Sequence, residues 1–284
     1  MHLSRRGFGV SVAASMSIGR SLNAEEEMCV PLRVIAYNVF KLTGWPNQRT
    51  LAKRAVAGGQ MAKRLAMELS LYSPDLVSFS ESPSERLTHE VADLMGMHHV
   101  RFPSGGSWPG TLLSKYEILD SENAPMKIAR PADLFTRHWG RGTIKLPEGD
   151  PLIVHSAHLY PTADPTIRLR EIRAMLEVMK ADLDAGRSML LIGDLNHGPD
   201  TEEYRLWMDA GWVDTFTKVG IGQGATIKSD IPKWRIDYVM AAGPIAHQVT
   251  ESRPLFEGAF RLNLDDKNSF ALSDHLPQFA RFER

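Results

Sequence analysis

Acids, amides and histidines recur at the ends of apolar runs along this chain of 284 residues. The eight that stand out are Asn38, Glu81, His158, Asp194, Asn196, Asp237, Asp274 and His275. Carboxylate and amide oxygens bind hard divalent cations, and an imidazole or a carboxylate can transfer a proton near neutral pH. No grouping of cysteine and histidine in the sequence has the spacing of a zinc site. The residue types therefore favour acid–base and oxygen-ligand chemistry over zinc chemistry.

Each of these residues lies beside a run that is typical of a β-strand. Asn38 ends the first run, Glu81 directly follows the second, and Asp194 follows the apolar residues 190–193. Polar groups at the ends of buried strands are costly unless they meet partners or a ligand. Because the strand ends of an open sheet gather along one edge, these side chains are expected to converge on one cleft.

The elements that must position these side chains alternate short β-branched runs with amphipathic stretches. Strands are predicted at 32–39, 76–79, 111–113, 143–146, 152–159, 189–192, 235–240 and 278–282. Helices are predicted at 51–71, 85–95, 167–183 and 201–210. Many strands with few intervening helices indicate two packed sheets with helices on their outer faces, in one domain.

The alternation of side chains along a strand separates the two histidines of 152–159. His155 and His158 have opposite parity, so at most one of them can face the cleft. His158 lies nearer the strand end and is the candidate, whereas His155 is assigned a structural role. Asp194 and Asn196 share a parity and are expected to face the same way.

The composition is that of an ordinary globular protein, with 43% hydrophobic and 24% charged residues. No apolar run approaches the roughly 18–20 residues of a membrane helix, so no stable membrane insertion is expected. Residues 1–24 hold three arginines and no acid, which leaves 30 basic and 34 acidic residues in the rest. This balance argues against a protein that grips duplex DNA by charge alone. The one cysteine, Cys29, excludes an internal disulfide.

Residues 1–24 have the pattern of a bacterial signal peptide, and residues 25–284 then form the mature domain. The pair Arg5-Arg6, followed by Phe8, is similar to a twin-arginine signal, and a mild apolar stretch at 10–19 follows it. A general secretory signal with an accidental arginine pair is the alternative. By either route, we expect an exported protein that is periplasmic or extracellular.

Seven short segments follow one another between residues 32 and 282. They are Tyr37-Asn38-Val39, Pro74-Asp75-Leu76-Val77 leading to Glu81, Gly110-Thr111-Leu112-Leu113-Ser114-Lys115, Ser156-Ala157-His158-Leu159, Gly193-Asp194-Leu195-Asn196, Arg235-Ile236-Asp237-Tyr238 and Ser273-Asp274-His275-Leu276-Pro277. In this order they resemble the endonuclease/exonuclease/phosphatase family, which includes deoxyribonucleases, abasic-site endonucleases, sphingomyelinases and inositol-phosphate 5-phosphatases. Two positions depart from the family pattern, because Ser80 replaces a common Gln and Ala157 replaces a common Thr.

The resemblance implies an α/β (α+β) fold of four layers, in which two mixed β-sheets pack face to face between outer helices. It implies hydrolysis of a phosphate ester with Mg²⁺, or Mn²⁺, as cofactor. A catalyst of this reaction must neutralise charge, aim a water molecule and help the leaving group depart. By resemblance, Glu81 is the main metal ligand, and Asn38 and Asp274 assist it.

By the same resemblance, the other residues act on the phosphate. Asp237 orients His275, and the formal base is either His275 or Asp194. His275 could instead act mainly as a cationic contact to phosphate, with Asp194 aiming the water. Asn196 would donate to a phosphoryl oxygen, and His158 would stabilise the pentacovalent phosphate or protonate the leaving oxygen.

A basic residue that faces phosphate is often found in the family at the position of Arg141. A solvated arginine is the alternative explanation. A neighbouring cluster could also help to hold a polyanion, with Trp139 as a stacking face. The cluster comprises Lys127, Arg130, Arg137, His138 and Trp139. A charged loop around one core tryptophan explains this cluster equally well.

The hypotheses about function differ mainly in the class of substrate. A nuclease that acts on nucleic acid is the first, because exported family members often degrade nucleic acid and the loop with arginine and tryptophan fits this use. A phospholipid or inositol-phosphate hydrolase is the second. A non-catalytic binding module, from a different functional class, is disfavoured by the intact set of acids and histidines. We expect a monomer.

Overall fold

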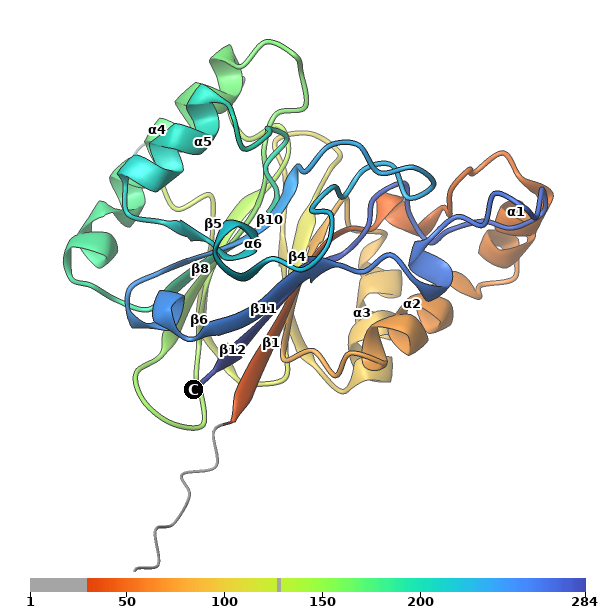
Figure 1. The fold of residues 1–284 in the computed structure, drawn as a ribbon, viewed down its shortest axis with the longest axis horizontal. Helices are drawn as coiled ribbons and strands as arrows, with labels where there is room; N and C mark the ends of the chain where they lie inside the picture. The colour runs from red at the N-terminus through yellow and green to blue at the C-terminus, as the bar shows by residue number, and fades with distance from the viewer. Residues whose placement is uncertain (1–29, 127–128) are drawn as a thin grey trace, which may run out of the picture.

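The computed structural model describes residues 30–126 and 129–284, which form two β-sheets packed face to face (Figure 1). The first sheet has the order β11-β12-β1-β2-β4-β3, with β1 Pro31–Asn38, β2 Leu76–Ser80, β3 His98–Phe102, β4 Gly110–Ser114, β11 Val249–Pro254 and β12 Gln278–Glu283. The second has the order β5-β6-β7-β8-β10-β9, with β5 Ile118–Asn123, β6 Trp139–Ile144, β7 Leu152–His158, β8 Met189–Asp194, β9 Val213–Asp214 and β10 Asp237–Ala242. The predicted signal peptide at 1–24 lies outside the described residues.

Helices cover the outer faces of both sheets. They are α1 Thr50–Ala57, α2 Met61–Ser70, α3 Glu85–Met95, α4 Thr166–Asp184, α5 Glu202–Asp209 and α6 Thr215–Val219, with 3₁₀ turns η1 Phe40–Leu42, η2 Pro244–His247 and η3 Gly258–Phe260. Figure 1 shows α4 and α5 on one side of the sandwich and α2 and α3 on the other. Within the described part of the chain, no helix is long and apolar enough to cross a membrane.

Alternate residues of the central strands face different layers. In β1, Val34 points into the interface between the sheets, whereas Ile35 packs against α1, α2 and α3. In β7, Val154 points into the interface and Ile153 packs against α4. Side chains of a strand alternate in this way, so two sheets with one buried interface and two covered outer faces need apolar residues at both parities. The four-layer fold predicted from the sequence is confirmed.

Each sheet has one parallel pair at its centre, β1–β2 in the first and β7–β8 in the second, and its other pairs are antiparallel. A parallel pair needs a crossover, which α1 and α2 provide in one sheet and α4 in the other. The register aligns Asn38 with Ser80, and His158 with Asp194. The carboxyl ends of both pairs lie at the same edge of the sandwich, because Asn38 and Asp194 are hydrogen-bonded across the two sheets.

The single helix predicted at 51–71 is two helices, α1 and α2, so this prediction was wrong in detail. Gly58 ends α1, and Gly59 adopts a left-handed conformation with φ of 65° between the two helices. Glycine is poor in a helix interior and tolerates positive φ, so the chain changes direction here although the apolar pattern continues.

The motif glycine before Asp194 is required by its neighbours. Gly193 has φ of 151°, and a Cβ atom there would lie 1.8 Å from the carbonyl oxygen of Ala157. Only glycine allows β7 and β8 to pair so closely at this point. This close pairing aligns Asp194 with His158 at the strand ends.

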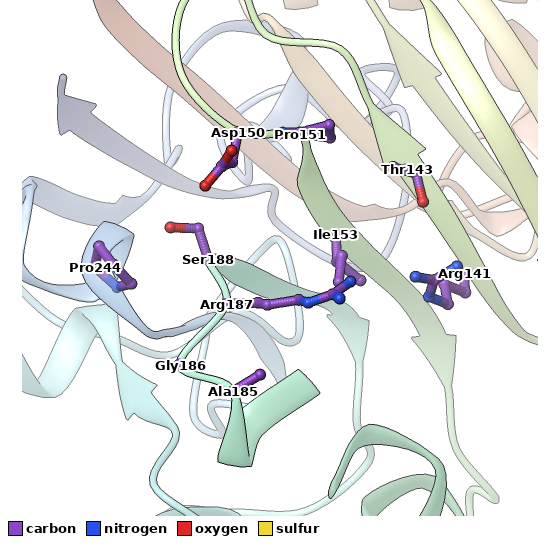
Figure 2. Close-up of a pocket in the computed structure, with 10 residues that line it drawn as sticks. All are labelled: Arg141, Thr143, Asp150, Pro151, Ile153, Ala185, Gly186, Arg187, Ser188 and Pro244. Atoms are coloured by element: carbon purple, nitrogen blue, oxygen red, sulfur yellow. The ribbon is translucent and has the colours of Figure 1, made fainter. Parts of the chain in front are cut away.

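Arg141 does not lie with the strand-end residues, which is a correction to the sequence prediction. Its guanidinium lies 3.6 Å from Asp120 and 4.0 Å from Asp182. Together with Arg187 it lines a cavity of about 410 Å³ near the starts of β7 and β8 (Figure 2). Arg141 has the parity of Trp139, which packs on the α4 side of the sheet, so its side chain faces away from the sheet interface.

Candidate active site

Asp194, the last residue of β8, lies at the centre of the predicted site. Its Oδ2 atom accepts a hydrogen bond of 3.0 Å from Asn38 Nδ2 and lies 3.5 Å from His158 Nε2. His275 Nε2 lies 3.9 Å from the same oxygen. Asn38 ends β1 of the first sheet and His275 lies three residues before β12 of the same sheet, whereas His158 and Asp194 end β7 and β8 of the second. The structure thus brings together four predicted residues that are far apart in the sequence.

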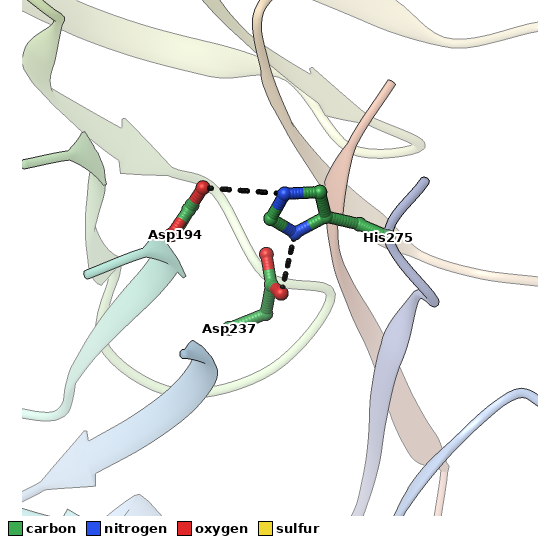
Figure 3. Close-up of side chains that lie close together, drawn as sticks. All are labelled: Asp194, Asp237 and His275. Atoms are coloured by element: carbon green, nitrogen blue, oxygen red, sulfur yellow. Dashed lines mark hydrogen bonds and ion pairs between the residues drawn. The ribbon is translucent and has the colours of Figure 1, made fainter. Parts of the chain in front are cut away.

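His275 lies between two carboxylates (Figure 3). Its Nδ1 atom is 2.9 Å from Asp237 Oδ2, and its Nε2 faces Asp194. Burial alone would lower the pKa of His275, but the charge and hydrogen bond of Asp237, followed by the charge of Asp194, raise it to about 10. His275 is therefore an imidazolium at neutral pH, and it can offer a proton or a positive charge to an anion.

Asp194 and His158 have the opposite tendency. Burial and the charge of Asp237 raise the pKa of Asp194 to about 7, against the opposing effects of His275 and Asn38. Burial, with a smaller effect from His138, lowers the pKa of His158 well below the usual value, so this ring is neutral. Neighbouring groups with different protonation states are the arrangement that acid–base catalysis requires.

The three predicted metal ligands also lie close to one another. Asn38 Nδ2 donates to Glu81 Oε1 at 3.3 Å. Burial raises the pKa of Glu81, and the charge of Asp274 raises it further, while the Asn38 hydrogen bond lowers it. Neither Glu81 nor Asp274 has an ion-pair partner within 4.0 Å among the described residues. Asn38 is buried and the two carboxylates are half-buried, and oxygen donors of this kind without a cationic partner suit a hard divalent cation.

A second group of possible ligands is Asp194, Asp237 and His275, whose ligand atoms lie within 4.8 Å of one another. Both ring nitrogens of His275 already face these two carboxylates. The imidazolium therefore offsets one carboxylate charge of the group, and hard divalent cations prefer oxygen to nitrogen ligands. The structure fits a cation better at Glu81, Asn38 and Asp274, and the identity of the metal ligands stays a prediction.

Strained backbone surrounds these residues. Glu81 and Asn196 have positive φ angles of 51° and 53°, and the whole turn η1 is left-handed, with Lys41 at φ of 53°. Such conformations cost non-glycine residues about 1 kcal/mol or more each and cluster at functional sites. Hydrogen bonds stabilise them, because Lys41 N donates to Glu81 O at 2.9 Å and Asn196 N donates to Asp194 Oδ1 at 3.1 Å.

Asn196 lies beside Asp194, but its amide already has a partner. Its Nδ2 atom donates to the carbonyl oxygen of Leu159 at 3.0 Å. This bond joins the ends of β7 and β8. The second N–H of the same amide can still donate to a phosphoryl oxygen, so that role stays a prediction.

Two residues of the basic cluster lie in different environments. Trp139 is fully buried, packs 5.0 Å from Phe135, and donates from Nε1 to His155 Nδ1 at 3.2 Å. It cannot stack on a ligand, and His155 has the structural role expected of it. Arg137, in contrast, lies near the site: burial lowers the pKa of its guanidinium, and the charges of Glu81 and Asp194 act in the opposite direction.

The sequence analysis did not identify Lys41 or Trp108 as site residues. Lys41 follows Asn38 by three residues, and its ammonium lies 3.6 Å from the centre of the Trp108 ring. Trp108 precedes the segment at 110–115 by two residues. Both lie next to segments that carry the family resemblance. Their position in the sequence was the one indication that they lie near the site.

Glu171 of α4 holds the two loops that flank the site. Its Oε1 accepts from Phe135 N at 2.7 Å and its Oε2 from Tyr160 N at 3.0 Å. Burial raises the pKa of Glu171 to about 7, although these two hydrogen bonds lower it. The folded state therefore keeps a proton that the unfolded state loses above its ordinary pKa of 4.5.

The sign of the resulting pH dependence follows directly. The stability that comes from this proton is complete below pH 4.5 and is lost as pH rises to about 7. We expect the free energy of unfolding of wild type to fall more over this range than that of Glu171→Gln, by at most about 3 kcal/mol. Urea unfolding at pH 4.5 and 7.5 measures this difference. Identical pH dependence of the two proteins would show that Glu171 is not protonated in the fold.

Comparison with known proteins gives a family and a fold. Residues 35–275 match the model of a family described as "Endonuclease/Exonuclease/phosphatase family". No curated protein matches the chain. The matched region includes Asn38, Glu81, Asp194 and His275.

Three similar solved structures share the fold at low sequence identity. A functionally unknown conserved protein from Enterococcus faecalis has a TM-score of 0.69 at 16% identity, over 89% of this chain and 100% of the other. Truncated TDP2 from Caenorhabditis elegans has a TM-score of 0.66 at 16% identity, over 89% and 98%. An AP endonuclease from Archaeoglobus fulgidus has a TM-score of 0.63 at 17% identity, over 89% and 100%. With its four-layer fold and its strand-end acids and histidines, the chain belongs to the endonuclease/exonuclease/phosphatase family.

Proposed function

We propose that this protein is a Mg²⁺-dependent phosphodiesterase that hydrolyses nucleic acid by attack of water on phosphorus. The observation that carries the proposal is the meeting of Asn38, His158 and His275 at one oxygen of Asp194. A buried carboxylate between one neutral and one protonated imidazole can accept a proton on one side while a cation meets phosphate on the other.

Each residue then has a role in the reaction. Asp194 takes the proton of the attacking water, and Asn38 holds the carboxylate in place. His275, oriented and kept protonated by Asp237, stabilises the negative charge that develops on the phosphate. His158 lies on the opposite side of Asp194 and contacts the phosphate or the leaving oxygen.

Glu81, Asn38 and Asp274 would hold the cation. When bound, it neutralises phosphate charge and polarises the phosphorus–oxygen bonds. The positive φ of Glu81 and the hydrogen bond from Lys41 N to its carbonyl oxygen fix its backbone, and the hydrogen bond from Asn38 Nδ2 to Oε1 orients its carboxylate.

Replacement of the main proposed ligand is expected to weaken metal binding. Glu81→Gln keeps the shape but removes the charge, so the Mg²⁺ concentration for half-maximal activity should rise about 10–100-fold. A titration of activity with MgCl₂ measures this, with Glu90→Gln, a partly exposed position of α3 that pairs with Arg86, as the matched control. An unchanged midpoint in Glu81→Gln would place the cation elsewhere.

Nucleic acid is the proposed substrate because a groove lies beside Asn196. It has a volume of about 850 Å³ and is lined by Asn196, Lys233 and Trp234, among others. The side chain of Trp234 is 61% exposed, which is unusual for so large a ring. An exposed aromatic ring beside a lysine suits a stacked base and its backbone phosphate.

The segment that holds Trp234 also supports the second candidate, a phospholipid hydrolase. Ile231 is 56% exposed and lies three residues before Trp234. Exposed apolar and aromatic side chains at one loop could enter a lipid surface. The groove favours nucleic acid, because a lipid headgroup would occupy only a small part of it.

One experiment tests enzyme and substrate together. The purified protein is incubated with plasmid DNA, RNA, sphingomyelin, an inositol polyphosphate and a chromogenic phosphodiester, each with Mg²⁺, with Mn²⁺ or with EDTA. We expect cleavage of DNA or RNA that EDTA abolishes. Preferred hydrolysis of sphingomyelin would support the lipid candidate, and no turnover by folded protein with metal present would overturn the phosphodiesterase proposal.

A further inference from the structure

Two cations share one aromatic ring beside the proposed metal ligands. Lys41 Nζ lies 3.6 Å, and Arg137 Cζ 4.7 Å, from the centre of the Trp108 ring. All three side chains are half-buried. Two cations contact the Trp108 ring. In the other cation–π contacts of the described residues, each ring has one cation.

Neither cation has a carboxylate partner in the part of the chain that the structure describes. No ion pair within 4.0 Å involves Lys41 or Arg137 among residues 30–126 and 129–284. The buried Nε of Arg137 also lacks a hydrogen-bond acceptor. By contrast, Arg235 lies over Phe216 and is neutralised by an ion pair with Asp214. Two partly desolvated like charges on one ring repel each other, so the arrangement favours an incoming anion.

The backbone fixes this group next to the reaction centre. Lys41 N donates to Glu81 O, and Ser82 N donates to Pro109 O at 2.9 Å, which joins the turn η1, the Glu81 loop and the Trp108 loop. Gly105 N donates to Phe135 O at 2.8 Å and joins the Trp108 loop to the segment of Arg137. Four segments that are distant in the sequence therefore hold the ring and both cations in one place.

We propose that Lys41, Trp108 and Arg137 form a binding site for a second phosphate of the substrate, next to the phosphate that is cleaved. The cations occupy the face of Trp108, so the ring holds the cations in place rather than stacking on a base. Lys41 N donates to Glu81 O and Ser82 N donates to Pro109 O, so this second phosphate would lie on the Glu81 side of the reaction centre.

This inference rests on the proposed function and makes it more specific. A substrate with one phosphate would leave the two cations without a ligand. A strand with consecutive phosphates fills both the reaction centre and the second site. The structure therefore favours a polyphosphate strand over an isolated phosphodiester.

The test measures binding without turnover. A fluorescein-labelled single-stranded DNA of eight nucleotides is titrated by anisotropy in EDTA at several salt concentrations. For single strands, each phosphate contact contributes about 0.7 to the slope of log K against log salt. We expect Lys41→Met and Arg137→Met each to reduce the magnitude of this slope by about 0.7. Arg261→Met, which removes a guanidinium that lies 4.9 Å from the Phe256 ring, is the matched control and should keep the wild-type slope.

The ring is tested separately. Trp108→Leu should weaken binding about fivefold, because the cations lose the contact that orients them, and Trp108→Phe should restore most of it. Circular dichroism and thermal unfolding establish that each variant is folded. If Trp108→Phe binds as weakly as Trp108→Leu, the ring does not act through the cations.

A parallel assay with Mg²⁺ separates the two proposals. Cleavage of the strand together with shallower slopes in both cation variants supports both. Cleavage with wild-type slopes in both variants overturns the second phosphate site and keeps the function. Shallower slopes without cleavage keep the site and overturn the function, whereas neither slope change nor cleavage overturns both.

Discussion

Asp194→Asn is expected to lower kcat about 10³–10⁴-fold while the protein stays folded. The variant removes the group that would accept the proton from water, but its amide oxygen can still accept the hydrogen bond from Asn38 Nδ2. A buried carboxylate beside Asp237 is itself costly, since burial raises the pKa of Asp194 to about 7. The amide can accept only one of the two hydrogen bonds that Asp194 accepts on separate oxygens, from Asn38 Nδ2 and from Asn196 N. This loss offsets the removal of the buried charge, so the melting temperature should change little.

Steady-state kinetics on the substrate preferred by wild type, together with a thermal melt, measure both effects. Asp182→Asn is the matched control, because Asp182 pairs with Arg141 and Arg187 away from the strand-end residues. It should retain wild-type kcat. If Asp194→Asn kept a tenth of wild-type activity or more, another group would be the base.

His275→Ala is expected to lower kcat about 10²–10⁴-fold and to destabilise the protein. The loss of activity follows from removing the cation that faces the phosphate. The loss of stability follows because Asp237, which is fully buried, would lose the hydrogen bond to His275 Nδ1, and its Oδ1 already has no partner. An uncompensated buried carboxylate costs about 3–5 kcal/mol.

These two effects can be separated in a double variant. Adding Asp237→Asn to His275→Ala removes the unpaired charge and should recover stability but not kcat. Chemical unfolding and kinetics on the three proteins measure this. Recovery of kcat along with stability would mean that His275 acts through the fold and not on the phosphate.

The sequence determined the central strands and most of the residues that the structure brings together. Interior strands are buried on both faces, so they have continuous β-branched and apolar runs that the chain shows directly. The four strands that were not predicted are β3, β5, β9 and β11. They are the edge strands of the two sheets. Edge strands carry polar and charged residues that protect the open side, as the exposed β5 does, so their pattern in the sequence is weak.

The sequence analysis assigned the phosphate-facing position to Arg141 and named Arg137 only as a member of the basic cluster. Both are arginines near one glycine-rich segment, and the sequence holds no record of which side of the sheet each faces. The start of β6 was not predicted because Gly140 interrupts its apolar pattern. Only glycine fits there, since a Cβ atom would lie 2.1 Å from the Phe102 ring. Once β6 starts at Trp139, the parity of the strand turns Arg141 toward α4, and Arg137 remains in the loop beside Glu81.

The sequence by itself determined the family, the layers and the positions of Asn38, His158 and Asp194 at the strand ends, because strand periodicity and motif order are local properties of the chain. Only the tertiary structure decided which protonation states these groups adopt and which cations surround them. Those properties depend on burial and on charges from the opposite sheet. They arise only when the two sheets pack and Asn38 meets Asp194.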